Sequence, residues 1–464
     1  MPLRKSYASL PIGYFSDSAN TCLWSIATGS CYPYSPTTKP SFWKNLKSDS
    51  MKRHSIFFLL LLCLSLTLTT SAQDVRDNEL SARQDSAVVD TIVPEWPQNL
   101  QTKLNKLLEN KLLEVSLAGI MVYDLTADSI IFSHNERQLM RPASTMKMIT
   151  AVAALDRLGG SHLFKTKLAY TGKLDNRTLD GNLYLIGGFD PQFSNEDLSA
   201  FAQRIKEMGI DTITGKLIAD KSMKDDKPMG EGWCWDDDDS NPLMSPLQIN
   251  KKDDVIGRFR RELIREGVHI VGFTEEGRAP RNVQEICVRS HTMDQILLPM
   301  MKNSDNLCAE AMFYQMGAAT GAHPANAKSA AGVVKKLITK LGLKTDDYRI
   351  ADGSGLSLYN YVTPELEMKF LKYAYENRHI YDHLYPSMPI AGEDGTLKKR
   401  MQGTPAAGNV HAKTGTVTGV SCLAGYCTAA NGHLLCFSIM NNGLTAASKG
   451  RNFQDRVCAT MCEP

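Results

Sequence analysis

The chain has 464 residues, of which 43% are hydrophobic and 22% are charged, and its formal net charge is +2. This length allows two or three domains of ordinary globular composition. The nearly balanced charge gives no reason to expect a nucleic-acid partner, and the sequence contains no internal repeat or low-complexity tract.

The N-terminal region predicts an export signal rather than a domain. Residues 1–50 mix Ser, Pro, Tyr and Trp without periodicity, and Met51 then opens a basic stretch, an apolar run over 56–68 and a small-residue exit. These are the parts of a secretory signal peptide, and the apolar run is short for a membrane span. We expect 51–72 to be cleaved near Ala72 and the protein to be exported to the periplasm, with 1–50 absent from the mature chain. An uncleaved membrane anchor is the competing interpretation.

The next segments predict a linker followed by the start of a catalytic domain. Residues 73–95 are polar and aperiodic, whereas apolar residues recur at helical spacing over 97–115. Residues 118–125 and 129–132 are typical of paired strands, and 146–155 form a long apolar helical pattern that ends before two glycines.

The sequence pattern changes over 164–272, and it indicates a smaller α/β domain inserted into the first domain. Short strands are predicted at 183–187 and 215–219, and a helix at 196–208. A second helix is predicted over 254–266.

Three late segments are rich in β-branched and apolar residues and predict strands: 410–417, 420–427 and 433–441. A helix follows from Thr445. Early and late strands therefore share one antiparallel sheet flanked by helices, in a catalytic domain built from 96–163 and 273–464. The predicted fold class is α/β in the α+β sense: an antiparallel sheet flanked by helices, with an inserted smaller domain.

Eight of the eleven cysteines lie beyond the predicted signal peptide, and eight thiols cannot be paired from sequence. The Asn-Gly pair at Asn431 and Gly432 predicts a two-residue hairpin, which places Cys427 opposite Cys436. A disulfide there would be strained, so two buried free thiols are the favoured interpretation.

Three short strings occur in one order: Ser144-Thr-Met-Lys147, Ser304-Asp-Asn306 and Lys413-Thr-Gly415. Each alone is weak, because Ser41-Phe-Trp-Lys44 also reads S-x-x-K and Ser18-Ala-Asn20 also reads S-x-N. Singly, the strings are typical of a helix cap, a loop turn and a strand end. Together and in this order they are the signature of penicillin-binding proteins and β-lactamases.

The chemistry of the trio explains the pattern. A serine hydroxyl needs a base within hydrogen-bond reach, and Lys147 lies on the same helical face as Ser144. The first helical turn also offers unpaired N–H groups for a developing oxyanion. Lys147 can act as a base only if burial or a neighbouring cation such as Lys413 lowers its pKa. Gly415 leaves room for a substrate chain to lie against its strand.

The chain resembles the D-alanyl-D-alanine carboxypeptidase/endopeptidase family of class C low-molecular-mass penicillin-binding proteins, peptidase family S13, over nearly all of 97–450. Seven segments carry the resemblance: Arg141–Lys147, Gly187–Pro191, Gly232–Asp236, Lys302–Asn306, Ala351–Ser357, Ala391–Thr396 and Ala412–Thr416. The Asp-Gly-Ser-Gly-Leu-Ser string is far more particular to this family than the trio is. The resemblance implies a β-lactamase/transpeptidase-like catalytic domain with an inserted smaller α/β domain.

The resemblance implies catalytic roles residue by residue. Ser144 would be the acylated nucleophile and Lys147 its base. Ser304 and Lys413 would relay the proton to the departing amine, and Asn306 would hold the substrate amide.

The resemblance also implies a substrate-binding set. Thr414 and Thr416 beside Gly415 would meet the terminal carboxylate, and the N–H groups of Ser144 and Thr416 would form the oxyanion hole. Asp237 would contact the free end of a diaminopimelate side chain, although its acidic loop also fits a solvated turn or an adventitious cation site.

Two departures from the family pattern bear on specificity. The interval from Ser144 to Ser304 is 160 residues, shorter than is usual in the family, so the third family domain is expected to be absent. Leu358 stands where relatives that bind diaminopimelate tend to carry arginine.

The leading interpretation is a periplasmic serine DD-peptidase that hydrolyses D-Ala-D-Ala termini of peptidoglycan stem peptides and is acylated by β-lactams. Cleavage of D-Ala–diaminopimelate cross-links and the oligomeric state stay open. The alternatives are a β-lactamase or esterase on the same fold, or a catalytically silent peptidoglycan-binding protein. No cofactor or metal is expected, because the sequence has no H-E-x-x-H motif and no evident histidine ligand cluster.

Overall fold

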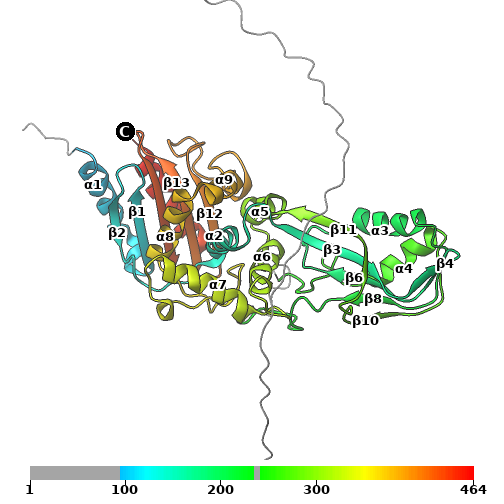
Figure 1. Cartoon of the computed structure of the whole chain (residues 1–464). Coiled ribbons are helices and arrows are strands. Elements are labelled where there is room, and N and C mark those ends of the chain that lie inside the picture. The colour runs from blue at the N-terminus through cyan, green and yellow to red at the C-terminus, as the bar shows by residue number, and fades with distance from the viewer. Residues whose placement is uncertain (1–94, 235–240, 464) are drawn as a thin grey trace, which may run out of the picture. The chain divides into compact units, whose positions relative to one another are not determined.

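The computed structural model describes residues 95–234 and 241–463 (Figure 1). The predicted upstream segment, signal peptide and most of the linker, together with Asp237, lie outside these residues. Within the described ranges, no helix combines the length and apolar character needed to cross a bilayer.

The first sheet confirms that early and late strands lie side by side. Its strand order is β12-β13-β14-β1-β2, and every neighbouring pair is antiparallel. The strands are β1 (Leu117–Asp124), β2 (Ser129–His134), β12 (His411–Val417), β13 (Val420–Thr428) and β14 (Leu434–Asn442). Pairing of β1 with β14 joins residues more than three hundred positions apart, and it leaves β12 at one edge of the sheet.

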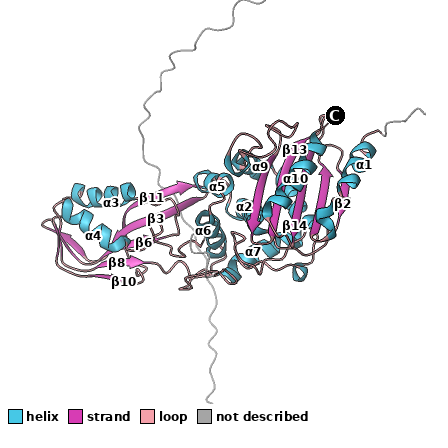
Figure 2. Cartoon of the chain, turned by 180° about the vertical axis from the view of Figure 1, so that it is seen from behind, coloured by secondary structure: helices cyan, strands magenta, loops and turns pink. Residues whose placement is uncertain are grey.

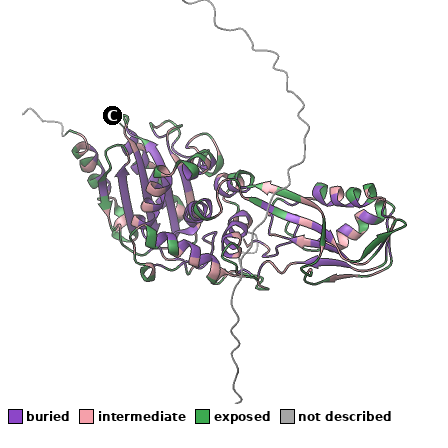
Figure 3. Cartoon of the chain, in the orientation of Figure 1, coloured by how far each residue is buried: buried purple, intermediate pink, exposed green. Residues whose placement is uncertain are grey.

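Helices cover both faces of this sheet, so its central strands are buried on both sides (Figure 3). Alternate residues of β13 enter two different cores, with Cys422 and Tyr426 in one and Leu423 and Cys427 in the other. The first core also contains α2 (Met146–Leu158) and α8 (Pro364–Glu376), and the second contains α1 (Gln98–Leu107) and α10 (Ala447–Cys462). Two-sided burial accounts for the continuous apolar character of β13.

The helix predicted over 97–115 is in fact α1 followed by a short 3₁₀ turn, Lys111–Glu114. Asn110 lies between them in an extended conformation, and its side chain accepts a hydrogen bond from the Leu112 N–H at 3.0 Å. This capping interaction starts a new turn where the apolar spacing by itself predicted continuation.

The hairpin register differs from the prediction by one residue. The Ala429 N–H donates to the His433 carbonyl, and Gly432 has a φ of 86°, so the loop has three residues and places glycine in the left-handed region. Cys427 consequently pairs with Leu435, while Cys436 pairs with Tyr426. A shift of one residue sends these two thiols to opposite faces of the sheet, and all eight described cysteines are free.

A second sheet lies in the segment predicted to be inserted, and its strand order is β10-β8-β6-β3-β11. Its strands are β3 (Leu163–Tyr170), β6 (Leu183–Gly187), β8 (Leu217–Asp220), β10 (Thr274–Glu276) and β11 (Gln284–Thr292). The division of the chain at residue 272 stays a prediction, but this sheet itself continues to Thr292, because β11 pairs with β3.

Two helices, α3 (Asn195–Glu207) and α4 (Val255–Arg265), pack on one side of this sheet in both views (Figure 2). A smaller sheet of short strands lies beside it: β4 (Lys173–Asp175), β5 (Thr178–Asp180), β7 (Thr212–Ile213) and β9 (His269–Ile270). Four further helices contribute to the first core: α5 (Met293–Lys302), α6 (Asn306–Ala318), α7 (Ala327–Lys340) and α9 (Arg378–Ser387).

Candidate active site

Ser144 lies in a 3₁₀ turn, Ala143–Thr145, that leads directly into α2. Ala143, just before it, has a φ of 48°, a conformation that non-glycine residues seldom adopt and that concentrates at functional sites. Two glycines let neighbouring backbone approach this turn. A Cβ on Gly415 of β12 would lie 2.5 Å from the Pro142 carbonyl, and a Cβ on Gly355 would lie 1.8 Å from the Ala143 carbonyl. The serine is thus wedged between a strand and a loop.

Lys147 is fully buried one turn after Ser144. Its Nζ lies 3.0 Å from Ser144 Oγ, 2.6 Å from Asn306 Oδ1 and 2.7 Å from the Ser354 carbonyl. Burial lowers the pKa of Lys147 to about 8, against the opposing effect of nearby carboxylates, chiefly Asp352. A neutral amine donates only two hydrogens, and two oxygen acceptors, Asn306 Oδ1 and the Ser354 carbonyl, already face it. Its lone pair is then left for the serine hydroxyl.

Ser304 and Lys413 form a second polar pair. Lys413 is fully buried, and its Nζ donates to Ser304 Oγ at 3.0 Å and to the Thr414 carbonyl at 2.7 Å. Burial and the charge of Lys147 lower the pKa of Lys413. Ser304 has a φ of 61°, and Asp305 caps α6 by accepting the Cys308 N–H at 2.8 Å. The start of α6 therefore presents Ser304 and Asn306 to the two lysines.

The loop that contains the Asp-Gly-Ser-Gly-Leu-Ser string holds the Ser354 carbonyl against Lys147. Asp352 is its buried centre. Asp352 accepts five hydrogen bonds, from the Gly355 N–H at 2.9 Å, the Ser357 N–H at 2.7 Å, Asn360 Nδ2 at 2.6 Å, Trp233 Nε1 at 2.8 Å and Ser354 Oγ at 3.4 Å. These donors hold the loop around the Asp352 carboxylate, so the position of Ser354 depends on Asp352.

Glu310 supports the same loop from α6. Its carboxylate accepts the N–H groups of Gly353 at 3.1 Å and Ser354 at 2.8 Å, and it is buried. Burial, together with the charge of Asp352, raises the pKa of Glu310. A second buried carboxylate, Glu367 of α8, accepts hydrogen bonds from Thr145 Oγ1 and from Ser438 Oγ, and burial raises its pKa to about 7.

Sequence reasoning assigned no role to Ser354, Asp352, Glu310 or Glu367. Asp352 and Ser354 belong to the Asp-Gly-Ser-Gly-Leu-Ser string, which sequence reasoning used only as evidence of the family resemblance. Glu310 offered a clearer signal, since it is a lone carboxylate in a run of apolar residues, Leu307–Phe313. Burial of such a residue requires hydrogen-bond partners.

The structure describes three of the four predicted substrate-binding residues. Thr414 and Thr416 lie with Gly415 on the edge strand β12, where Thr416 is exposed and Thr414 Oγ1 contacts Thr396 Oγ1 at 2.8 Å. The Leu358 N–H donates to the Gly232 carbonyl at 3.1 Å. Leu358, which stands where relatives that bind diaminopimelate tend to carry arginine, therefore lies beside the loop that leads to Asp237. Asp237 itself lies outside the described residues. Across the described ranges, no three His, Cys, Asp or Glu side chains form a group suited to a metal ion.

A serine paired with a buried lysine, a second serine–lysine pair and a lysine-bearing edge strand together define a penicillin-recognising active-site serine enzyme. The comparisons with known proteins narrow this class. The model of the D-Ala-D-Ala carboxypeptidase 3 (S13) family matches residues 100–250 and 239–462. The chain therefore belongs to the D-Ala-D-Ala carboxypeptidase S13 family.

Individual relatives agree with this assignment. D-alanyl-D-alanine carboxypeptidase DacB of Haemophilus influenzae is 28% identical over 419 residues, covering 72% of this chain and 87% of DacB. A crystal structure of penicillin binding protein 4 (dacB) from the same organism superposes with a TM-score of 0.71 and 26% identity, covering 77% of this chain and 97% of that one. A second structure of that protein, complexed with a β-lactam, gives a TM-score of 0.65 and 27% identity, covering 76% and 98%.

Proposed function

We propose that this protein hydrolyses the D-Ala-D-Ala terminus of peptidoglycan stem peptides through an acyl-enzyme at Ser144. The observation that carries the proposal is the contact of Ser144 Oγ with the buried Lys147 amine at 3.0 Å, whose pKa of about 8 makes the neutral form accessible. Family membership and the β-lactam complex of the similar dacB structure support the substrate and inhibitor classes.

The acylation step follows from the geometry. Lys147 Nζ takes the hydroxyl proton as Ser144 Oγ attacks the carbonyl carbon of the penultimate D-Ala. The C–N bond then breaks, and the proton held by Lys147 passes through Ser304 Oγ, which Lys413 contacts at 3.0 Å, to the leaving amine of the terminal D-Ala, so Lys147 is neutral again. Water subsequently cleaves the serine ester and returns the hydroxyl proton to Ser144.

Binding of the substrate uses the edge of the first sheet. In the described chain β12 pairs with one strand, β13, and its outer edge is bridged by Ile390 at His411. Beyond this bridge a peptide can add to the edge as a further strand. Thr414 and Thr416 would then meet the terminal carboxylate, and Asn306 would hold the substrate amide. Cleavage of cross-links between stem peptides, an endopeptidase reaction, uses the same site on a longer leaving group.

The same proposal places the reaction outside the cytoplasm, in the periplasm. Its support is the basic, apolar and small-residue order of residues 51–72 and the location of the substrate.

Labelled penicillin tests the function directly. Wild-type protein is expected to gain one covalent adduct, located by peptide mass on Ser144, and to release D-Ala from purified muropeptides. Ser144→Ala should lose both reactions. A Ser41→Ala variant of the full chain provides the control, because its S-x-x-K string matches by sequence alone. Well-folded protein that takes up no label would contradict the proposal.

A further inference from the structure

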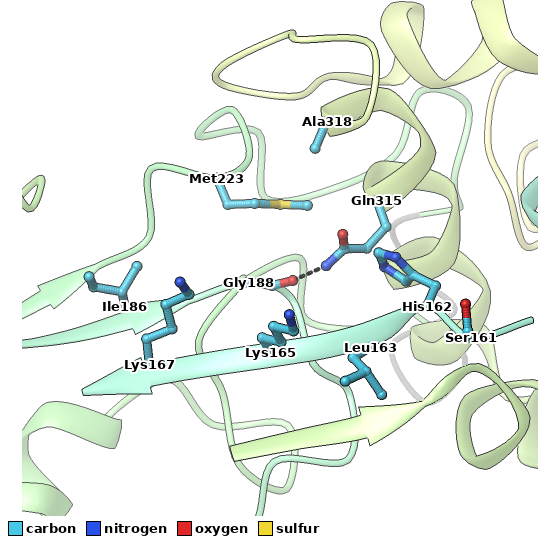
Figure 4. A pocket seen from close by; sticks show the side chains of 10 residues that line it. All are labelled: Ser161, His162, Leu163, Lys165, Lys167, Ile186, Gly188, Met223, Gln315 and Ala318. Carbon is cyan, nitrogen blue, oxygen red and sulfur yellow. Dashed lines mark hydrogen bonds between the residues drawn. The ribbon is translucent and has the colours of Figure 1, made fainter. Parts of the chain in front are cut away.

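The second sheet carries two adjoining cavities on the face opposite α3 and α4. The first has a volume of about 500 Å³ and the second about 490 Å³, and Lys167, Ile186 and Met223 line both. Lys165 and Lys167, two positions apart on β3, rise from the same side of the strand toward Met223 and Gln315 (Figure 4). None of the lining residues belongs to the serine–lysine site.

The carboxylates that line these cavities already have partners. Both oxygens of Asp220 accept backbone N–H groups, from Ser222 and Ala279, each at 2.8 Å. Glu285 forms an ion pair with Lys167 at 2.8 Å. Both carboxylates are therefore already bound to other groups of the cavity walls.

Three cations have no such partner. Lys165, Arg278 and Arg281 are exposed at the cavities and form no ion pair with any carboxylate in the described part of the chain. Unpaired cations grouped along a hollow concentrate positive potential there and attract anions. Ile186 and Met223 add apolar surface to the lining of both cavities.

We propose that this cationic double cavity, lined by Lys165, Arg278 and Arg281, binds the free carboxylates of neighbouring stem peptides on the peptidoglycan strand being cut. The proposal rests on the proposed function, whose substrate is a polymer that repeats peptides with a terminal carboxylate. Methyl groups of the D-Ala residues would contact Ile186 and Met223.

The distance between the two sites suits a polymer. Helix α6 begins with Asn306 in the serine–lysine site and ends at Ala318, which lines the first cavity. Thirteen helical residues span about 20 Å, whereas an extended five-residue stem peptide spans about 17 Å. A small D-Ala-D-Ala peptide cannot occupy both sites, but a strand that carries several stem peptides can.

Co-sedimentation with insoluble peptidoglycan, stripped of phosphate-containing polymers, tests binding without turnover. On a Ser144→Ala background, Arg278→Gln/Arg281→Gln is expected to weaken binding about five- to tenfold, the effect of losing two exposed charge contacts. Lys173→Gln/Arg261→Gln is the matched control, because it removes two exposed cations of the same region that do not line the cavities. Equal binding by both double variants would overturn the proposal, and so would sedimentation that requires the phosphate polymers.

Kinetics separate this proposal from the proposed function. With Ser144 intact, the Arg278→Gln/Arg281→Gln variant should lose about five- to tenfold in kcat/KM on polymeric peptidoglycan, and keep wild-type kcat/KM on a soluble D-Ala-D-Ala tripeptide and wild-type penicillin labelling. Equal losses on polymer and tripeptide would overturn the cavity proposal. Absence of a penicillin adduct in wild-type protein would instead overturn the proposed function.

Discussion

Trp233 donates its indole N–H to the buried carboxylate of Asp352 at 2.8 Å, and this bond connects the segment predicted to be inserted to the catalytic machinery. Asp352 also holds the loop whose Ser354 carbonyl accepts from Lys147 Nζ at 2.7 Å. A side chain far from the serine in sequence thus helps to position the base.

Trp233→Phe should test this connection. The variant removes one of the donors to a buried carboxylate oxygen that keeps the Ser357 N–H. This loss costs about 1–3 kcal/mol in the free energy of unfolding, and it loosens the position of the Ser354 carbonyl. We expect a lower rate of penicillin acylation with little change in the concentration dependence of binding. Trp96→Phe, which contacts His433 away from the site, is the control. Unchanged acylation in a variant with the expected stability loss would show that Asp352 is held without Trp233.

The rate of acylation should depend on pH through Lys147. Its pKa is lowered to about 8, so the amine is protonated and inactive as a base at lower pH. The rate should rise with pH and level off above about 8, and at pH 7 it should be about tenfold below the plateau. Stopped-flow measurement with a chromogenic β-lactam gives the profile. Lys147→Arg should abolish the reaction because guanidinium does not lose its proton. A flat profile between pH 6 and 9 would argue against Lys147 as the base.

Glu367 should make stability depend on pH. Burial raises the pKa of Glu367 to about 7, from an ordinary value of 4.5. Between these pH values the folded protein binds a proton that the unfolded chain lacks, so the free energy of unfolding falls as pH rises, by about 3 kcal/mol in total. Glu367→Gln should make the fall between pH 5 and pH 8 smaller than in the wild type, as measured by urea unfolding, while the part contributed by the buried Glu310 stays. Glu365→Gln, two residues earlier and partly exposed, should retain the wild-type fall. A similar slope in both variants would exclude Glu367 as its source.

Gly415→Ala should damage the site although it adds one methyl group. The new Cβ would meet the Pro142 carbonyl at 2.5 Å and the Thr145 nitrogen at 2.9 Å, so β12 or the serine turn must shift. We expect a loss of at least tenfold in acylation rate and about 1–3 kcal/mol in stability, as for other overpacked sites. Gly332→Ala in α7, where a Cβ meets nothing within 4 Å, should keep activity and gain up to about 1 kcal/mol. Normal acylation by Gly415→Ala would show that the turn adapts.

Local sequence determined much of this protein, because helix caps, strand patterns and the serine-to-lysine spacing act over a few residues. The helix that carries Lys147 and the strand that carries Lys413 are both where the pattern predicted them. The three strings also named Ser144, Lys147, Ser304, Asn306 and Lys413 as candidates. In the structure Lys147 contacts Ser144 and Asn306, and Lys413 contacts Ser304, two residues before Asn306.

Tertiary structure alone decided the features that depend on contacts between distant segments. The register of one hairpin, set by the left-handed Gly432, separated Cys427 from Cys436. Burial, which no short string encodes, lowers the pKa of Lys147 and raises that of Glu367. Packing of residues 230–234 against residues 352–360 created the Trp233–Asp352 bond. The sequence thus supplied the reacting groups, while the fold supplied the low-dielectric surroundings and the buried hydrogen bonds that make a lysine a base.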